Sequence, residues 1–299
     1  MKTKTIIIML AVMFVFAACE KPVIDDTTGK VDPTEANVII KFHQYEQEAF
    51  SAGGTDIANT RAATDITNLC SRINLAVFDS EGTKVKTVTQ KETDAGYGTV
   101  ALSLAEGTYE LVVIAHNGEG AATITSTDKV TFYNNKITDT FYYYGNLVVG
   151  AEKKNYDLEL TRAVAMFRMV LTDENIPASV TKFKFYYLGG SSTFSPKDGY
   201  GCVASKQTEI RAVAANGVYE IYTMPHTEED MLTKLTVTAQ DANDNTVSER
   251  VFENIPIVRN QVTKYTGSFF GEGGSAGAVD GSLRMTANPD WDAVKGYGF

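Results

Sequence analysis

From residue 38 onward, hydrophobic and polar positions alternate in short runs that are separated by turn residues. In "KFKFYY", Phe183, Phe185 and Tyr187 fall on one face, while Lys182 and Lys184 fall on the other. Because successive side chains of a strand point to opposite faces, this period of two predicts strands that are buried on one side. Short strands with turn signals about every 8–12 residues are typical of β-sandwiches. We therefore expect an all-β fold with antiparallel sheets.

The alternating pattern is interrupted once, near residue 150, by the charged, turn-rich segment "GAEKKNYD". It then restarts, which predicts two tandem β-sandwich domains, at residues 37–150 and 151–272. The glycine-rich stretch "GEGGSAGAVDG" ends the second domain and leads into a C-terminal segment, so that residues 273–299 form a linker and a strand segment. In the first half, only "ATDITNLCSRI" has the spacing of a short helix.

The N-terminus has the features of an export signal. Lys2 and Lys4 precede eleven residues without a polar side chain, Ile6 to Phe16, and two alanines follow. A charged start, an apolar stretch and small residues at a cleavage point are typical of a secretory signal peptide, which we assign to residues 1–18. Eleven residues rise only about 17 Å as a helix, against a hydrocarbon core of about 30 Å, so we do not expect a transmembrane anchor.

Cys19 follows the small residues Ala17 and Ala18, an order that resembles the bacterial lipobox, although Phe16 stands where leucine is usual. We interpret Cys19 as the lipidated first residue of the mature chain. The alternative is a plain signal peptide that ends near a cysteine. Several acyl chains would anchor the protein stably, since each buried CH₂ contributes about 0.8 kcal/mol. The polar segment 19–36 would then be a tether between the membrane and the folded part.

Composition and charge narrow the classes of function. The signal holds two of the 27 basic residues and none of the 37 acidic ones, so the mature chain has a net charge of −12. This acidic chain lacks the basic footprint of a nucleic-acid-binding protein. With Cys19 lipidated, only Cys70 and Cys202 remain, and they lie far apart in the sequence. We expect both to be free, buried small side chains and not a disulfide.

Three patterns suggest chemistry, and none of them predicts an active site. Residues 273–277 match G-x-S-x-G, but glycines surround the serine and no histidine follows it, so we interpret the segment as a linker. "DANDN", residues 241–245, has the alternate spacing of a calcium loop but lacks its later glycine and glutamate, which favours a hairpin turn. The histidines show no metal-ligand spacing: His43, His116 and His226. We expect no catalytic residue, no metal and no cofactor.

Several stretches resemble the fimbrillin superfamily of Bacteroidetes, the building blocks and accessory subunits of surface pili. They are "GTYELVVIAHN", "LTRAVAMFRMVLTD", "VYEIYTMPH" and "IPIVRNQVTKYTGSFF", the last with an Arg-Asn-x-x-Thr-x-x-x-Gly strand at Arg259, Asn260, Thr263 and Gly267. None of these is a catalytic motif. The resemblance implies transthyretin-like sandwiches and a non-enzymatic, structural role in a fimbrium at the outer membrane.

The resemblance also implies a route of assembly. An arginine-specific protease would remove the first strand of the subunit, and a strand from the next subunit would fill the exposed groove by β-augmentation. Arg61 lies in a small-residue segment suited to proteolysis, and cleavage before Ala62 would free residues 19–61. The alternative is that Arg61 is an ordinary solvated residue; an uncleaved chain would remain lipidated as an anchor. Shaft, tip and anchor roles stay open at this point.

A candidate donor strand lies behind the glycine linker, where Leu283, Met285 and Ala287 have a period of two. It fits an exchangeable strand, and it fits the last strand of the second sandwich equally well. The partners expected from the resemblance are other fimbrial subunits and the membrane, through the lipid anchor. Receptors on host or bacterial surfaces are left open as further partners, and no nucleic acid is expected.

The alternative function is that of a glycan-binding lipoprotein at the cell surface. Its aromatic platform would draw on three consecutive tyrosines, Tyr142, Tyr143 and Tyr144. Consecutive residues of a strand alternate between faces, so at most two of them can share one surface, and packing in the core or between domains is favoured. Trp291 is the single tryptophan, which argues mildly against a sugar platform.

Overall fold

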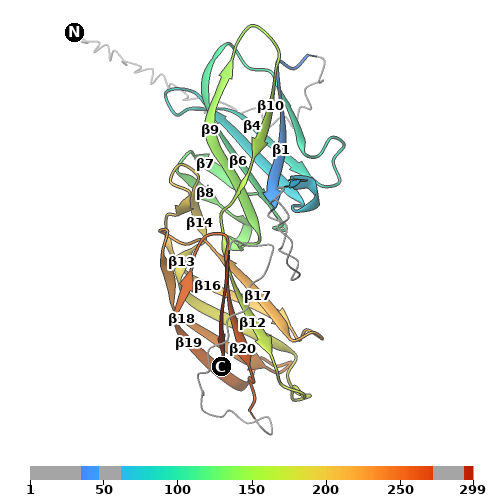
Figure 1. Cartoon of the computed structure of the whole chain (residues 1–299), viewed down its shortest axis with the longest axis vertical. Coiled ribbons are helices and arrows are strands. Elements are labelled where there is room, and N and C mark those ends of the chain that lie inside the picture. Colours follow the sequence, from blue (N-terminus) through green and yellow to red (C-terminus); the bar gives the residue numbers. More distant parts are fainter. Residues whose placement is uncertain (1–34, 47–61, 272–292, 299) are drawn as a thin grey trace, which may run out of the picture.

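The protein is elongated, with two β-rich halves along its long axis (Figure 1). The computed structural model describes residues 35–46, 62–271 and 293–298. Apart from two single-turn 3-10 helices, Ile66–Asn68 and Tyr133–Asn135, the regular structure of these residues consists of strands. None of the helices in these ranges is long and apolar enough to cross a membrane. The predicted all-β fold is confirmed.

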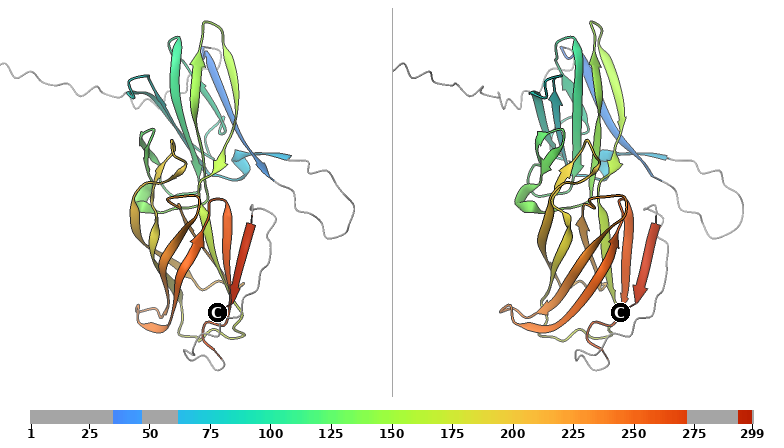
Figure 2. Two further views of the ribbon diagram at one scale, coloured as in Figure 1. Left: turned by 60° about the vertical axis from the view of Figure 1, so that its left-hand side comes forward. Right: turned by 90° about the vertical axis from the view of Figure 1, so that its left-hand side faces the viewer.

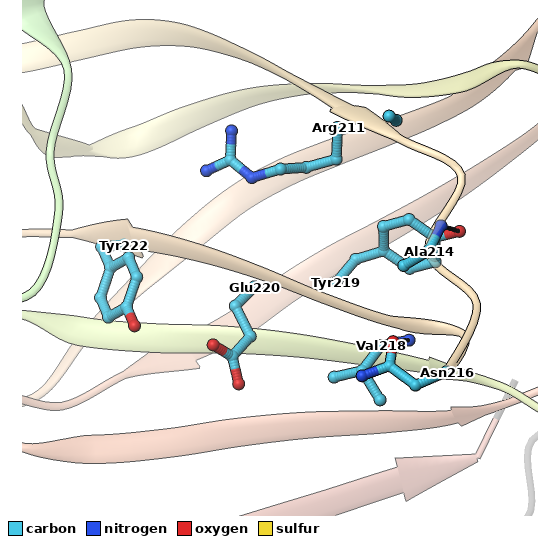
Figure 3. A pocket seen from close by; sticks show the side chains of 8 residues that line it. Arg211, Ala214, Asn216, Val218, Tyr219, Glu220 and Tyr222 are labelled. Atoms are coloured by element: carbon cyan, nitrogen blue, oxygen red, sulfur yellow. Dashed lines mark hydrogen bonds between the residues drawn. The ribbon is translucent and has the colours of Figure 1, made fainter.

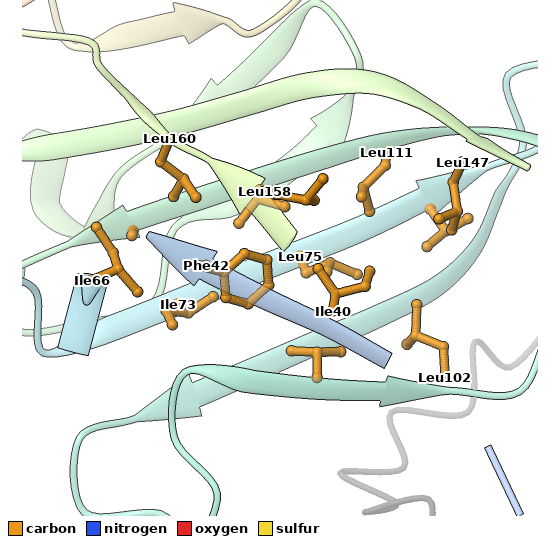
Figure 4. Close-up of a cluster of buried hydrophobic side chains, with 14 of the residues drawn as sticks. Ile40, Phe42, Ile66, Ile73, Leu75, Leu102, Leu111, Leu147, Leu158 and Leu160 are labelled. Carbon is orange, nitrogen blue, oxygen red and sulfur yellow. The ribbon is translucent and has the colours of Figure 1, made fainter. Parts of the chain in front are cut away.

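Two facing sheets build the N-terminal half. The first consists of β1 (Val38–Glu46), β2 (Ala62–Asp65), β5 (Thr99–Leu102) and β10 (Lys154–Glu159). The second has the order β11-β9-β6-β3-β4, with β3 (Arg72–Phe78), β4 (Lys84–Lys91), β6 (Gly107–His116), β9 (Thr140–Val149) and β11 (Thr161–Arg162). Alternate apolar side chains of both sheets meet in one buried core, which includes Ile40 and Phe42 from one sheet and Leu75 and Leu111 from the other (Figure 4).

The C-terminal half is a second sandwich. One sheet has the order β17-β12-β20-β21, with β12 (Ala165–Leu171), β17 (Val218–Thr223), β20 (Gln261–Gly267) and β21 (Ala293–Gly298). The facing sheet has the order β16-β13-β18-β19, with β13 (Lys182–Ser191), β16 (Ala204–Ala212), β18 (Asp230–Gln240) and β19 (Thr246–Ile257). Phe183, Phe185 and Tyr187 are buried, so the face that their spacing predicted is the core face.

A small sheet joins the two halves. It has the order β15-β14-β8-β7, with β7 (Thr123–Ser126), β8 (Lys129–Thr131), β14 (Thr193–Ser195) and β15 (Tyr200–Gly201). β8 belongs to the N-terminal half and β14 to the C-terminal half, and they pair directly, with Thr131 opposite Thr193. A third buried cluster lies around this ladder and takes side chains from both halves, among them Phe78 and Val262. The connection therefore consists of a strand ladder and a shared core.

Arg162 is a buried charge at this connection. Its side chain is 8% exposed, and its Nε and Nη2 donate to the two carboxylate oxygens of Asp139 at 2.8 and 3.0 Å. Nη1 donates to Oδ1 of Asn260 at 2.9 Å, and the guanidinium lies 4.7 Å from the ring centroid of Phe141. A bidentate pair of this kind compensates for the desolvation of the charge. Arg162 thereby links β11 to the turn before β20.

Two features differ from the expectations drawn from the sequence. Three ladders are parallel, β1 with β10, β12 with β20 and β20 with β21, whereas antiparallel sheets were expected throughout. The stretch expected to hold a short helix contains β2 and one 3-10 turn, which begins after Asp65, whose carboxylate accepts from the amide of Thr67 at 2.9 Å. The domain boundary at residue 150 stays a prediction; β10, which follows it, pairs within the first sheet of the N-terminal half.

Candidate assembly site

Every second side chain of β1 projects into the core of the N-terminal half. Val38, Ile40 and Phe42 are at most 3% exposed and belong to the main cluster, in which Figure 4 shows Ile40 and Phe42. Ile39 and Lys41 are not part of that cluster and are more exposed. Burial of a side chain of this size contributes about 1.5–3 kcal/mol. The three together therefore contribute an energy comparable to the total stability of many domains, about 5–15 kcal/mol.

β1 is also the strand around which its sheet is built. β10 runs parallel to it from Val38 opposite Lys154 to His43 opposite Glu159. β5 pairs antiparallel with the first part of β1, and β2 pairs antiparallel with its last part. Within the described ranges, β2, β5 and β10 pair with β1 and with no other strand. Removal of β1 would therefore remove every ladder in this sheet.

Further hydrogen bonds hold β1 at its start and at His43. Before the strand, Nδ2 of Asn37 donates to the carbonyl of Leu104 at 2.7 Å, and the amide of Leu104 donates to Oδ1 of Asn37 at 3.1 Å. The side-chain amide thus continues the ladder with β5 by one step. After residue 43, the carbonyl of His43 accepts from the amide of Leu160 at 2.8 Å, and Nδ1 of His43 lies 2.9 Å from Oδ1 of Asp157.

Of the site residues predicted from the sequence, only Ala62 lies in the described part of the chain. It is the first residue of β2 and pairs with Glu46 of β1. The others lie outside the described residues: Cys19, Arg61, Leu283, Met285 and Ala287. Residues 273–277 and Trp291 lie outside them as well. Lipidation, cleavage and the donor strand therefore stay predictions.

The three consecutive tyrosines of β9 are used for packing. Tyr143 packs against the core of the N-terminal half, while Tyr142 and Tyr144 pack against the cluster shared by both halves. The ring of Tyr142 meets that of Phe194 edge-on at 4.8 Å, and its hydroxyl accepts from Nη1 of Arg259 at 2.9 Å. The alternation expected for a strand is observed, and β9 does not present these rings as one exposed platform.

The "DANDN" segment forms the hairpin turn between β18 and β19. Oδ1 of Asp241 accepts from the backbone amides of Asn243 and Asn245 at 2.9 and 2.8 Å, and Oδ2 accepts from the side chain of Asn245 at 3.0 Å. These bonds, the one from the Asn245 side chain first, hold the pKa of Asp241 below its usual range. In the ranges that the structure covers, no group of three or more His, Cys, Asp or Glu side chains could hold a metal ion.

His116 is a buried, neutral histidine. Its Nδ1 accepts from the amide of Gly118 at 3.0 Å, so Nε2, which lies 3.1 Å from Oδ1 of Asn74, carries the proton. The ring stands edge-on to Phe132, with 5.7 Å between centroids. Burial, with a smaller effect of the Arg72 charge, lowers the pKa of His116 from 6.5 to about 4. The side chain therefore packs as an uncharged group.

The two remaining cysteines are free thiols in different halves. Cys70 is buried in the core of the N-terminal half, and burial raises the pKa of its thiol. Cys202 is exposed, which contradicts the expectation of two buried side chains. The reason is its position in the short connection between β15 and β16, where it faces solvent.

A surface hollow of about 440 Å³ lies between the end of β16 and β17 (Figure 3). Its charged side chains already have partners within the protein. Nη1 of Arg211 donates to Oε2 of Glu209 at 2.9 Å, and Oε1 of Glu220 accepts from Nε of Arg168 at 2.7 Å. The hydroxyl of Tyr219 accepts from a backbone amide at 3.1 Å. The hollow therefore carries no unpaired charge that would select a ligand.

Two parts of the candidate assembly site around β1 were not predicted from the sequence. The strand "YDLEL" was assigned to the second domain, although Leu158 and Leu160 are buried in the same core as β1. Their alternation predicts a strand, but no local pattern indicates which strand it pairs with. Asn37 was not singled out either, because its role depends on Leu104, far away in the sequence.

Comparison with known proteins finds a family model that matches most of the chain. A family model described as "Fimbrillin-A associated anchor proteins Mfa1 and Mfa2" matches residues 32–295. The match therefore covers almost all of the described residues, including β1 and β10. Among curated proteins, none matches the chain.

Solved structures with a similar course of the chain come from species of Bacteroides and Porphyromonas. A candidate adhesin from Bacteroides ovatus is 14% identical, with a TM-score of 0.48, over 72% of this chain and 76% of that one. A candidate polysaccharide-binding protein from Bacteroides thetaiotaomicron is 13% identical, with a TM-score of 0.46, over 71% and 78%. The fimbrial anchor protein Mfa2 from Porphyromonas gingivalis is 10% identical, with a TM-score of 0.36, over 71% and 80%.

Proposed function

Because the chain belongs to the family of fimbrillin-A associated anchor proteins Mfa1 and Mfa2, we propose that it is the anchor subunit of a cell-surface fimbrium and that it keeps its first strand. A shaft or tip subunit would lose this strand by cleavage and receive another in its place. The position of β1 favours the anchor role over both. This central position of β1 in its sheet is the single observation that carries the proposal.

The argument rests on what β1 holds together. An exchangeable strand is most easily replaced where its neighbours remain paired with one another when it leaves. Here β2, β5 and β10 have no described partner except β1, so its loss would dissolve a whole layer of the sandwich. The exposed remainder would be the apolar face of the second sheet, including Leu75 and Leu111. A subunit with this construction is better suited to retaining β1 than to releasing it.

Retention of β1 keeps the fold connected to the membrane. With Cys19 lipidated and residues 19–36 as a tether, an uncleaved chain would remain attached to the outer membrane through β1. Other fimbrial subunits would then join by receiving a strand from this chain. The segment around Leu283, Met285 and Ala287 is the candidate donor, since its apolar residues have the spacing of a strand and follow a glycine-rich stretch of the sequence.

The alternative function, glycan binding at the surface without catalysis, lacks a comparable observation. Tyr142, Tyr143 and Tyr144 are engaged in packing, and the charged groups of the hollow beside β17 are paired. A structural role requires no catalytic group. We therefore assign the chain to fimbrial attachment and not to an enzymatic or sugar-binding role.

The test is the N-terminal residue and intact mass of the protein recovered from the cell surface. A diacylated or triacylated Cys19 as the sole N-terminus is the expected result. A mature chain that begins at Ala62 would overturn the anchor proposal, because β1 would then be removed in the assembled state. An unmodified N-terminus near residue 19 would contradict lipidation while leaving strand retention in place.

A further inference from the structure

We propose that β1 and β10 form a mechanical clamp, which transmits tension from the N-terminal tether into the folded chain. This inference rests on the proposed anchor function in one respect only, the two points at which the load is applied. These points are the chain before Val38 and the C-terminal half. The clamp itself is a property of the strand geometry. Its test needs neither lipid nor fimbrium, so the two proposals can fail separately.

The directions of the two strands decide how they are loaded. β1 and β10 are parallel, and both point from the far end of the N-terminal half toward the C-terminal half (Figures 1 and 2). A pull on the chain before Val38 draws β1 along its own axis, away from the C-terminal half. A pull on the C-terminal half reaches β10 through β11 and draws it the other way. The pair is therefore loaded in shear.

Shear loads the bonds between the strands simultaneously. Six residue pairs connect β1 and β10, from Val38 with Lys154 to His43 with Glu159. Two flanking hydrogen bonds extend the connection: the amide of Lys154 donates to the carbonyl of Asn37 at 2.9 Å, and that of Leu160 donates to His43 at 2.8 Å. Strands that slide along their common axis must break these bonds together, whereas strands that are peeled from one end break them one after another.

The remaining contacts of β1 resist the same movement. Its antiparallel ladders with β2 and β5 are also sheared when β1 slides. The side chains of Val38, Ile40 and Phe42 project into the close-packed core across the direction of sliding. The paired amide contacts between Asn37 and Leu104 stand at the end where the load enters. Resistance is thus concentrated on the first strand after the tether.

The experiment is single-molecule force spectroscopy on the mature, unlipidated chain. Handles are attached to the thiols of Cys19 and Cys202, since Cys202 is exposed while Cys70 is buried in the core and out of reach of the reagent. We expect one rupture that releases the N-terminal half as a unit, because β1 holds its first sheet together. The release frees roughly 120 residues, about 400 Å of extended chain.

The matched control loads the same pair as a zipper. In the variant with Glu152→Cys and Cys202→Ser, the handles sit on Cys19 and on the exposed turn before β10. Both strands are then pulled apart from the same end. We expect rupture at a clearly lower force than in the shear geometry. Equal rupture forces in the two geometries would overturn the clamp.

A pair of neighbouring substitutions provides the second control. Ile40→Ala removes a buried side chain and should lower the rupture force in the shear geometry. Ile39→Ala changes the outer face of the same strand and should leave the force unchanged. Equal effects of both substitutions would contradict a clamp that is locked into the core. Recovery of cleaved chains from cells would refute the anchor role and leave these force measurements as they are.

Discussion

Acidification from pH 7 to pH 5 should destabilise the N-terminal half through His116. The buried imidazole has a pKa of about 4 in the folded protein, against 6.5 for an exposed histidine. Between these values the unfolded chain binds a proton that the folded chain does not. Stability is therefore fully present above pH 6.5 and is lost progressively as the pH falls through the folded pKa. One pKa unit corresponds to about 1.4 kcal/mol, so the loss at pH 5 is about 2 kcal/mol.

The contacts of His116 explain why protonation is unfavourable. Nδ1 accepts a hydrogen bond from the amide of Gly118, so a proton added there would break this bond and leave the amide without its acceptor. Arg72 adds a positive charge nearby and opposes a second one on the ring. Asn74 offers its carbonyl oxygen to Nε2, which is already protonated. The site accommodates a neutral ring only.

The assay is urea unfolding, followed by circular dichroism at pH 7, 6 and 5, on the protein and on His116→Gln. Glutamine keeps an amide group that can reach Asn74 but does not titrate in this range. The protein should lose about 2 kcal/mol more than the variant between pH 7 and pH 5. Contributions from all other groups cancel in this difference. Parallel pH profiles of the two proteins would refute the assignment of the low pKa to burial of His116.

Four further substitutions, one of them a control, test the site and the connection between the halves. Ile40→Ala should lower the free energy of unfolding by about 2–5 kcal/mol, whereas Ile39→Ala should change it by no more than about 0.5 kcal/mol. Denaturation curves that shift equally for both variants would show that β1 is not held by its inner face. Arg162→Ala leaves the Asp139 carboxylate without its bidentate partner and should lower the free energy of unfolding by about 3–5 kcal/mol. Thermal unfolding measures this loss, and an unchanged unfolding temperature would contradict it. Asn37→Ala removes both side-chain hydrogen bonds with the backbone of Leu104, just after β5, and should cost about 1–3 kcal/mol. Hydrogen exchange at the Leu104 amide should become faster; unchanged exchange there would speak against this pairing.

The sequence predicted the strands well because their signal is local. The alternation of Phe183, Phe185 and Tyr187 with polar residues reports burial on one face, and these side chains are buried in the structure. The tyrosines of β9 alternate for the same reason. A period of two follows from strand geometry alone, so it survives whatever partners the strand acquires.

Pairing of strands could not be predicted in the same way. Nothing in "NVIIKF" or "YDLEL" indicates that these segments lie side by side and parallel, since they are separated by more than a hundred residues. The central position of β1, on which the proposed function depends, follows from that pairing. The contacts of Asn37 and Arg162 are likewise made with residues far away in the sequence. Local patterns constrain burial, whereas the arrangement of partners is decided by the packing of the whole chain.

The cluster shared by both halves, together with the β8–β14 ladder, has a consequence for how such chains diversify. Domains that touch only through a linker can be recombined between homologues, and each brings its own core. Here Phe78 and Val262 pack in one interior although they come from different halves of the molecule. A chimera that joined this N-terminal half to the C-terminal half of a distant relative would inherit two mismatched surfaces in place of one packed seam. The two sandwiches are therefore expected to be inherited as a pair, with substitutions on one side of the seam compensated on the other.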